Sequence, residues 1–200
     1  MNNVGKDLNL AATILLGGGV VAFPTETVMG LGVVYDNFDA YGRLNYLKGK
    51  REDKPYSLMV GNVNDISNFA VVDDRAQKLI DKFLPGPLTL LLPATEKVPG
   101  YVTHNTDVVG IRVSDHPIVS ELANKVKKPL LVPSANPSNQ EPAVTVDKVL
   151  VYFNDALDYI VNNDSNGDLP STIVDVTKKE VKIVREGKIL REDILNCLGE

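Results

Sequence analysis

Short apolar runs alternate with segments of helical periodicity along the sequence, and this alternation constrains the fold more than any other feature. Runs typical of buried strands occupy residues 20–23, 31–34, 56–60, 88–92, 108–113, 130–132, 159–161, 172–176 and 181–184. Apolar residues recur at helical spacing in 8–16, 38–47, 63–69, 74–83, 118–126, 146–153 and 191–198. Because some strands follow one another directly while helices separate others, we predict an α+β (mixed α/β) fold: a twisted sheet of parallel and antiparallel strands, flanked by helices.

The composition fits one globular domain, which we expect to comprise residues 1–200. The chain is 44% hydrophobic and 24% charged, and it has no run of about eighteen apolar residues that would cross a membrane. Its net charge of -5 argues against a protein that coats nucleic acid non-specifically. A single cysteine, Cys197, cannot form an internal disulfide, and no export signal is evident, so we expect a cytoplasmic protein.

Residues 22–32 read Ala-Phe-Pro-Thr-Glu-Thr-Val-Met-Gly-Leu-Gly and place polar side chains between two apolar runs. Thr25, Glu26 and Thr27 require hydrogen-bond partners if they are buried at this junction. The pattern indicates a ligand-binding turn. The structural alternative is a plain strand-turn-strand unit in which the threonines satisfy the backbone.

Further polar or cationic clusters follow at the ends of apolar runs, where open sheets commonly bind ligands. They are Lys48-Gly-Lys50-Arg51 with Lys54-Pro55, Val109-Gly-Ile-Arg112-Val, Val132-Pro-Ser134-Ala-Asn136-Pro, and Ser171-Thr172 with Arg185. Taken singly, the cations read as solvated loop residues and the small polar residues as turn residues. Together with the sequences Pro-Thr-Glu-Thr-Val at 24–28 and Pro-Gly-Pro-Leu-Thr-Leu at 85–90, their order resembles the YrdC-type threonylcarbamoyl-adenylate synthases over about the whole chain.

The resemblance implies an enzyme of the nucleotidyltransferase type. It would condense L-threonine, bicarbonate or CO2, and ATP into L-threonylcarbamoyladenylate and pyrophosphate. A downstream partner, a tRNA-modifying transferase complex, would place the threonylcarbamoyl group on tRNA. The resemblance also implies a YrdC-like fold with a concave basic face, in its single-domain version. Mg2+ would be bound through the phosphates of ATP, with no metal site on the protein.

The family pattern also assigns roles to individual residues. Three residues are expected to contact threonine, with the second of them clamping its carboxylate: Thr27, Arg112 and Ser171. Six are expected to bind ATP: Lys48, Lys50, Lys54, Ser134, Asn136 and Arg185. Lys48, Lys50 and Arg112 are the catalytic candidates, because phosphoryl chemistry needs cations where negative charge develops. The lesser candidates are Thr25, Arg51 and Thr172.

The sequence departs from the family pattern at three places. Relatives usually have Lys-x-Arg where this chain has Lys48-x-Lys50 followed by Arg51, which leaves open whether Lys50 or Arg51 contacts phosphate. Met29 and Met59 stand where relatives commonly have Tyr and His. We interpret both as losses of polar groups near the threonine pocket, which reduces the expected selectivity for threonine.

Two alternative functions remain open from the residues alone. One is an RNA-binding module acting in ribosome or tRNA maturation, although an aromatic content of only 6% supplies few stacking platforms. The other is carbamoyl-adenylate chemistry on a different amine. The polar segment at 162–168 is either a solvated connection or a lid over the site. His104 and His116 read as surface or loop histidines.

Overall fold

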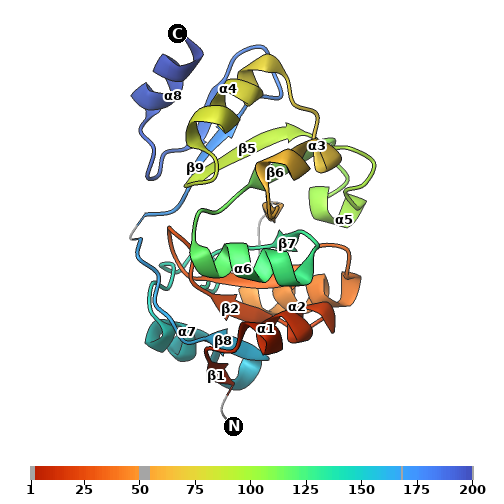
Figure 1. Cartoon of the computed structure of the whole chain (residues 1–200), viewed down its shortest axis with the longest axis vertical. Coiled ribbons are helices and arrows are strands. Elements are labelled where there is room, and N and C mark those ends of the chain that lie inside the picture. Colours follow the sequence, from red (N-terminus) through yellow and green to blue (C-terminus); the bar gives the residue numbers. More distant parts are fainter. Residues whose placement is uncertain (1–2, 50–54, 168, 200) are drawn as a thin grey trace.

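The centre of the protein is a mixed sheet, seen in a computed structural model that describes residues 3–49, 55–167 and 169–199 (Figure 1). The described strands form one ten-stranded sheet in the order β1-β8-β2-β3-β7-β4-β6-β5-β9-β10. Their bounds are β1 Val4–Gly5, β2 Val21–Phe23, β3 Gly30–Val34, β4 Leu58–Met59, β5 Leu88–Pro93, β6 Val108–Arg112, β7 Leu130–Leu131, β8 Tyr159–Val161, β9 Thr172–Asp175 and β10 Lys182–Arg185.

Both strand orientations occur in this sheet. Strands β2 and β3 form an antiparallel hairpin in which Val21 pairs with Gly32. Strands β5 and β9 are parallel, with Leu88 opposite Thr172. The predicted mixed parallel and antiparallel sheet is therefore confirmed, and nine of its described strands coincide with apolar runs in the sequence.

Four of the described α-helices begin where a short polar side chain accepts hydrogen bonds from the first free backbone N–H groups. The α-helices are α1 Leu8–Leu16, α2 Phe38–Lys48, α3 Ile66–Phe69, α4 Asp74–Phe83, α5 Gly100–Thr103, α6 Pro117–Val126, α7 Val146–Phe153 and α8 Arg191–Leu198; the 3-10 helices are η1 Val63–Asp65 and η2 Asn154–Ala156. Asp7 caps α1, Asn37 caps α2, Asp73 caps α4 and Thr145 caps α7. Such caps explain why these helices begin where they do.

Two hydrophobic clusters hold the helices on the sheet. Helices α1 and α6 lie side by side on one face (Figure 1), where Leu15 and Leu122 pack against Phe23 of β2. The other cluster contains residues of the remaining helices, including Leu44 of α2 and Leu79 of α4. Alternation along the strands makes both faces apolar, as expected of a sheet that is covered on two sides.

The last third of the chain runs between the two ends of the molecule. Figure 1 shows residues 162–167 and 169–171 along one side of the molecule, between β8, near the N-terminal end, and β9, near the C-terminal end. Within the described ranges, no helix combines the length and the apolar character needed to cross a bilayer.

Candidate active site

The loop between β2 and β3 is held by the hydroxyl group of Thr25. Its Oγ1 donates to the carbonyl oxygen of Val28 at 2.7 Å and accepts from the backbone N–H of Thr27 at 3.2 Å. The hydroxyl oxygens of the two threonines are 2.9 Å apart. Both side chains are buried, so these contacts supply the partners that their burial requires.

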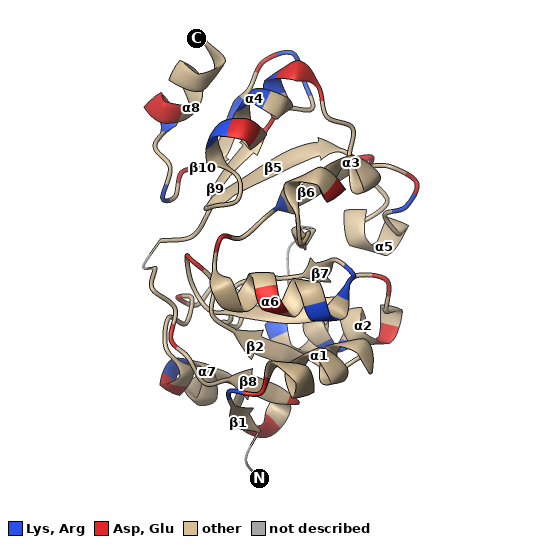
Figure 2. Ribbon diagram, in the orientation of Figure 1, with Lys and Arg blue, Asp and Glu red and all other residues tan. Residues whose placement is uncertain are grey.

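Arg112, the last residue of β6, directs its guanidinium to this loop; Figure 2 shows a basic segment at this end of β6. Its Nη2 donates to Oε1 of Glu26 at 2.6 Å and to Oγ1 of Thr27 at 2.8 Å, while its Nε donates to the same Oε1 at 3.2 Å. The second carboxylate oxygen of Glu26 accepts from the hydroxyl of Ser114. The side chains of Arg112 and Glu26 are only 10% and 11% exposed, so the loop contains a buried ion pair.

Ser171 and Arg185 form a second polar group, next to the start of β9 and at the end of β10. The Nε and Nη2 atoms of Arg185 donate to the carbonyl oxygen of Ser171 at 3.1 and 2.8 Å, and Nη2 also donates to its hydroxyl at 3.2 Å. This hydroxyl lies 2.9 Å from Oγ1 of Thr89 on the parallel strand β5. Partial removal from water lowers the pKa of Arg185, and the positive charge of Arg112 lowers it further. The two guanidinium groups therefore repel each other, and an anion bound beside both would relieve this repulsion.

Lys48, the last residue of α2, organises the Ser-Ala-Asn turn. Its Nζ donates to the carbonyl oxygens of Ser134 and Asn136 at 2.6 and 2.5 Å, and to Oδ1 of Asn136 at 3.2 Å. The hydroxyl of Ser134 donates to the same Oδ1 at 2.6 Å. Because Lys48 is only 4% exposed, carbonyl dipoles rather than bulk water stabilise its ammonium group.

Backbone contacts join the Ser-Ala-Asn turn to the β2–β3 loop. The N–H of Ala135 donates to the carbonyl oxygen of Met29 at 2.7 Å. Gly30 and Ser134 form an antiparallel bridge next to this bond. The turn held by Lys48 therefore lies directly against the end of the loop that contacts Arg112.

The segment at 162–167 packs over the same loop. The hydroxyl of Ser165 donates to the carbonyl oxygen of Thr25. A Cβ atom at Gly167 would collide with the carbonyl oxygen of Thr27, so only glycine permits this close approach. From the other side, Nζ of Lys188 donates to the carbonyl oxygen of Glu26 at 3.2 Å. Both segments enclose the loop.

Comparison with known proteins identifies the family to which this arrangement belongs. A family model named Sua5/YciO/YrdC, described as telomere recombination, matches residues 13–187. The chain belongs to the Sua5/YciO/YrdC family. The resemblance predicted from the order of the polar clusters is thereby confirmed.

Curated members of the Sua5/YciO/YrdC family match most of the chain. A protein of Pseudomonas aeruginosa (strain UCBPP-PA14) named threonylcarbamoyl-AMP synthase is 37% identical over 175 residues, which cover 86% of this chain and 93% of the relative. A protein of the same name from Vibrio campbellii is 32% identical over 186 residues, covering 91% of this chain and 100% of the relative.

Solved structures of the family have the same fold. Sua5 of P. abyssi, in a complex with L-threonine, matches at a TM-score of 0.93 and 30% identity, over 100% of this chain and 61% of that chain. YciO of E. coli matches at a TM-score of 0.90 over 98% of this chain and 100% of its own. At 24% identity, the likeness to YciO supports the fold alone.

The structure brings together seven of the residues that the family pattern singles out. They lie in the three contact groups described above: Thr27 with Arg112, Ser171 with Arg185, and Lys48 with Ser134 and Asn136. Arg185, expected at the ATP end, lies against Ser171, which was expected at the threonine end. Lys50, Arg51 and Lys54 lie outside the described residues.

Thr25 and Thr172, the two threonine residues among the lesser site candidates, form hydrogen bonds that stabilise loops. Thr25 holds the β2–β3 loop, as described above. Thr172 is fully buried, and its hydroxyl donates to the carbonyl oxygen of Ile189 at 2.6 Å and accepts from the N–H groups of Gly187 and Ile189, each at 3.0 Å. Both hydroxyls therefore fix loops around the site.

The two methionines that depart from the family pattern are buried in the core. Met29 has no exposed surface and belongs to one hydrophobic cluster, and Met59 is 4% exposed and belongs to the other. Neither methionine side chain is accessible to a ligand in this conformation. An effect of these two residues on threonine selectivity would therefore have to act through the packing of the core.

Glu26, Ser114 and Thr89 were not among the predicted site residues, although each contacts one of them. Ser114 follows Arg112 by two positions, and side chains two apart along an extended chain point to the same face. This spacing is the signal that the sequence offers for Ser114. Glu26 stands between two site threonines, but only the tertiary structure shows that its carboxylate meets Arg112.

The interpretation of His116 as a surface or loop histidine was right about the loop, because His116 directly precedes α6, but its side chain is buried. It is 6% exposed and caps α6, with Nδ1 accepting from the N–H of Ile118 at 3.3 Å. Loss of hydration on burial lowers the pKa of His116, although the carboxylates of Glu26 and Asp115 oppose this effect. The neutral imidazole is therefore favoured at neutral pH.

Acidification is expected to destabilise the protein through His116. Its folded-state pKa lies below the ordinary value of 6.5, so the unfolded chain binds the proton more readily and the free energy of unfolding falls as the pH decreases through this value. His116→Asn keeps a good cap and removes the titration. Urea unfolding at about pH 7.5 and about pH 5.5 should show a smaller loss for the variant. Equal losses in both proteins would contradict this role.

Proposed function

We propose that this chain is a threonylcarbamoyl-AMP synthase, which condenses L-threonine, bicarbonate and ATP and releases pyrophosphate. The observation that carries the proposal is the buried guanidinium of Arg112 beside Thr27, near a second guanidinium, that of Arg185. The names of relatives 37% and 32% identical to the chain support it, and so does the L-threonine complex of the related P. abyssi Sua5.

The chemistry requires cations and directed donors rather than a covalent nucleophile. The amine of threonine attacks CO2 formed from bicarbonate and loses a proton, which gives a carbamate. A carbamate oxygen then attacks the α-phosphorus of ATP, and the bond from this phosphorus to the pyrophosphate group breaks. Negative charge increases on the departing pyrophosphate, so fixed positive groups lower the barrier.

The proposed roles follow the three contact groups. Arg112 would bind the carboxylate of threonine with its planar fork, assisted by Thr27 and Ser171. The Ser-Ala-Asn turn held by Lys48 would bind ATP through Ser134 and Asn136. Arg185 contacts Ser171, so it would lie at the boundary between the two substrates, where the carbamate meets the α-phosphate. We keep Arg185 among the proposed ATP-binding residues because of this position.

The segment at 50–54 and the metal complete the proposed ATP site. Lys50, Arg51 and Lys54 would supply positive charge to the phosphates. Mg2+ would arrive as a complex with ATP, held by phosphate oxygens and water, and would neutralise the triphosphate. It is thus part of the substrate.

The product is a reactive mixed anhydride, which makes direct use by a second enzyme advantageous. We therefore include in the proposal a downstream tRNA-modifying transferase complex and a cytoplasmic location. Contact between this chain and RNA is a separate proposal, which the synthase activity does not require and which the titration below tests.

Purified protein supplied with ATP, Mg2+, L-threonine and bicarbonate should release pyrophosphate and form threonylcarbamoyl-adenylate, detected by mass spectrometry. Leaving out threonine or bicarbonate should stop product formation. A parallel series with L-serine and L-valine tests the acceptor, because the first lacks the methyl group and the second lacks the hydroxyl group. Faster turnover of either would favour carbamoyl-adenylate chemistry on another amine.

A salt titration of tRNA binding tests the RNA-binding alternative. Salt-sensitive binding of tRNA without any ATP-dependent product would overturn the enzymatic proposal. Product formation by a protein that binds no RNA would exclude RNA binding as its main function.

A further inference from the structure

Resting on the proposed function, we infer that Glu26 is a positioning residue, which holds Arg112 by one edge and leaves the other edge for the carboxylate of the amino-acid substrate. The contacts are asymmetric. The Nε–Nη2 edge of the guanidinium is bound to a single oxygen of Glu26, and the second proton of Nη2 points to Thr27. Among the described residues, none accepts a hydrogen bond from Nη1.

An arginine has five N–H groups arranged along two edges, each of which can bind a carboxylate. Here Glu26 occupies the Nε–Nη2 edge. The remaining edge consists of Nη1 and the Nη2 proton that Thr27 accepts, so an incoming carboxylate would accept from Nη1 and share the Nη2 proton with Thr27, whose own hydroxyl proton is donated to Thr25. This geometry places two of the proposed threonine-binding groups on one small surface.

Glu26 is itself fixed at several points. One carboxylate oxygen is bound to Arg112 and the other accepts from Ser114, whose hydroxyl also accepts from the backbone N–H of His116. The carbonyl oxygen of Glu26 accepts from Lys188. A carboxylate that is held in this way and 11% exposed is suited to hold Arg112 in one orientation.

The ion pair with Glu26 also offsets the cost of burying the positive charge of Arg112. A buried guanidinium without a counter-ion is strongly destabilising, and a second guanidinium, that of Arg185, lies close enough to lower its own pKa through repulsion. Glu26 neutralises Arg112 before the substrate arrives. The side chain of Arg112 then loses its conformational freedom when the protein folds, so substrate binding does not have to bear this entropy cost.

The competing interpretation is that Glu26 blocks Arg112 and must leave before the substrate carboxylate can bind. The two interpretations predict opposite effects of Glu26→Gln, which keeps the shape and an acceptor oxygen but removes the charge. A positioning role predicts weaker threonine binding. A blocking role predicts tighter binding, because a competing carboxylate is gone.

Steady-state kinetics of Glu26→Gln should show a threonine KM raised roughly tenfold or more, with kcat and the KM of ATP changed by less than about twofold. Glu121→Gln is the matched control, because Glu121 is 55% exposed and pairs with Lys125 on the surface of α6. It should leave all constants unchanged. A threonine KM that is unchanged or lower in Glu26→Gln would overturn the inference.

Ser114→Ala decides the matter if Glu26→Gln does not fold. It keeps both charges and removes only the hydroxyl that holds Glu26, so a smaller rise, about threefold, is expected in the threonine KM. An unchanged threonine KM in a folded Ser114→Ala protein, shown by circular dichroism and thermal unfolding, would count against positioning.

Arginine NMR separates failure of this inference from failure of the proposed function. In 1H–15N spectra, the Nε–H signal of Arg112, assigned by its loss in Arg112→Lys, should be shifted in the wild-type protein and should move in Glu26→Gln. Positioning predicts that saturating L-threonine leaves the wild-type signal near its original place, whereas displacement of Glu26 would move it to the place seen in Glu26→Gln and overturn the inference. Absence of any threonine binding by wild-type protein in calorimetry would instead refute the proposed function.

Discussion

Arg112→Ala is expected to reduce kcat/KM for threonine by about 100-fold to 1,000-fold. Truncating one partner of a buried, hydrogen-bonded charge pair costs roughly 2–5 kcal/mol, and here the lost group is also the proposed ligand of the substrate carboxylate. Initial rates of pyrophosphate release at varied threonine and saturating ATP measure the effect. Arg112→Lys should recover only a small part of the activity, because an ammonium group cannot replace the planar fork.

Two controls make the Arg112 experiment specific. The alanine variant leaves the buried carboxylate of Glu26 unpaired, which by itself should destabilise the fold by roughly 3–5 kcal/mol. The double variant Arg112→Ala with Glu26→Gln should regain stability but not threonine use. Ser134→Ala should mainly raise the KM of ATP. Similar small effects of Arg112→Ala and Ser134→Ala on both substrates would contradict the assignment of the two ends.

Lys48→Met is expected to weaken the use of ATP at least about tenfold and to lower the free energy of unfolding by about 3 kcal/mol. Methionine fills a similar volume but cannot donate to the carbonyl oxygens of Ser134 and Asn136, which would remain buried without this partner. The Ser-Ala-Asn turn would then lose its shape. The KM of ATP and urea unfolding curves measure the two effects.

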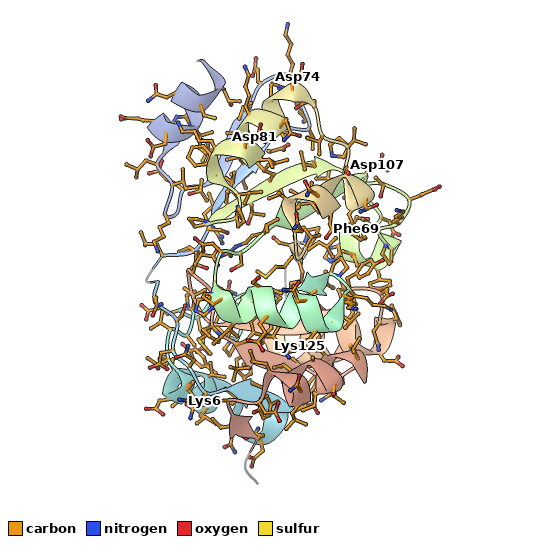
Figure 3. The ribbon with its side chains drawn as sticks, in the orientation of Figure 1. Lys6, Phe69, Asp74, Asp81, Asp107 and Lys125 are labelled. Atoms are coloured by element: carbon orange, nitrogen blue, oxygen red, sulfur yellow. The ribbon has the colours of Figure 1, made fainter. Side chains whose placement is uncertain are left out.

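Lys6→Met is the matched control for Lys48→Met. Lys6 is exposed and directly follows β1, near the N-terminal end of the molecule (Figure 3). Removing this solvated charge should change neither stability nor ATP use appreciably. A Lys48→Met protein as stable and active as the Lys6→Met protein would show that the buried ammonium group does not organise the turn.

Much of the fold could be predicted because its signals are local. Apolar runs and helical spacing identified the main strands and helices. Strand β1 escaped notice, since its two residues are ordered by pairing with β8, where Val4 lies opposite Ile160. The predicted helix at 63–69 is divided into η1 and α3, a detail that helical spacing alone does not reveal.

The candidate site was predictable in part. The order of the polar clusters identified the groups that the structure brings together, because their sequence context resembles a known family. The ion pair between Arg112 and Glu26 was not predicted, since 86 positions separate the two residues and no local pattern joins them. Likewise, the burial of His116 at the start of α6 is not indicated by the residues that flank it.

The position of residues 162–167 and 169–171 along the molecule has a consequence for how the protein is made. Thr27 and Ser171 belong to segments that lie far apart in the sequence, and Arg185 emerges later still. On a translating ribosome, the hairpin of β2 and β3 can form early, but its loop must wait for Ser165 and Gly167 to cover it. A nascent chain can therefore assemble the candidate site only after Arg185 has left the ribosome.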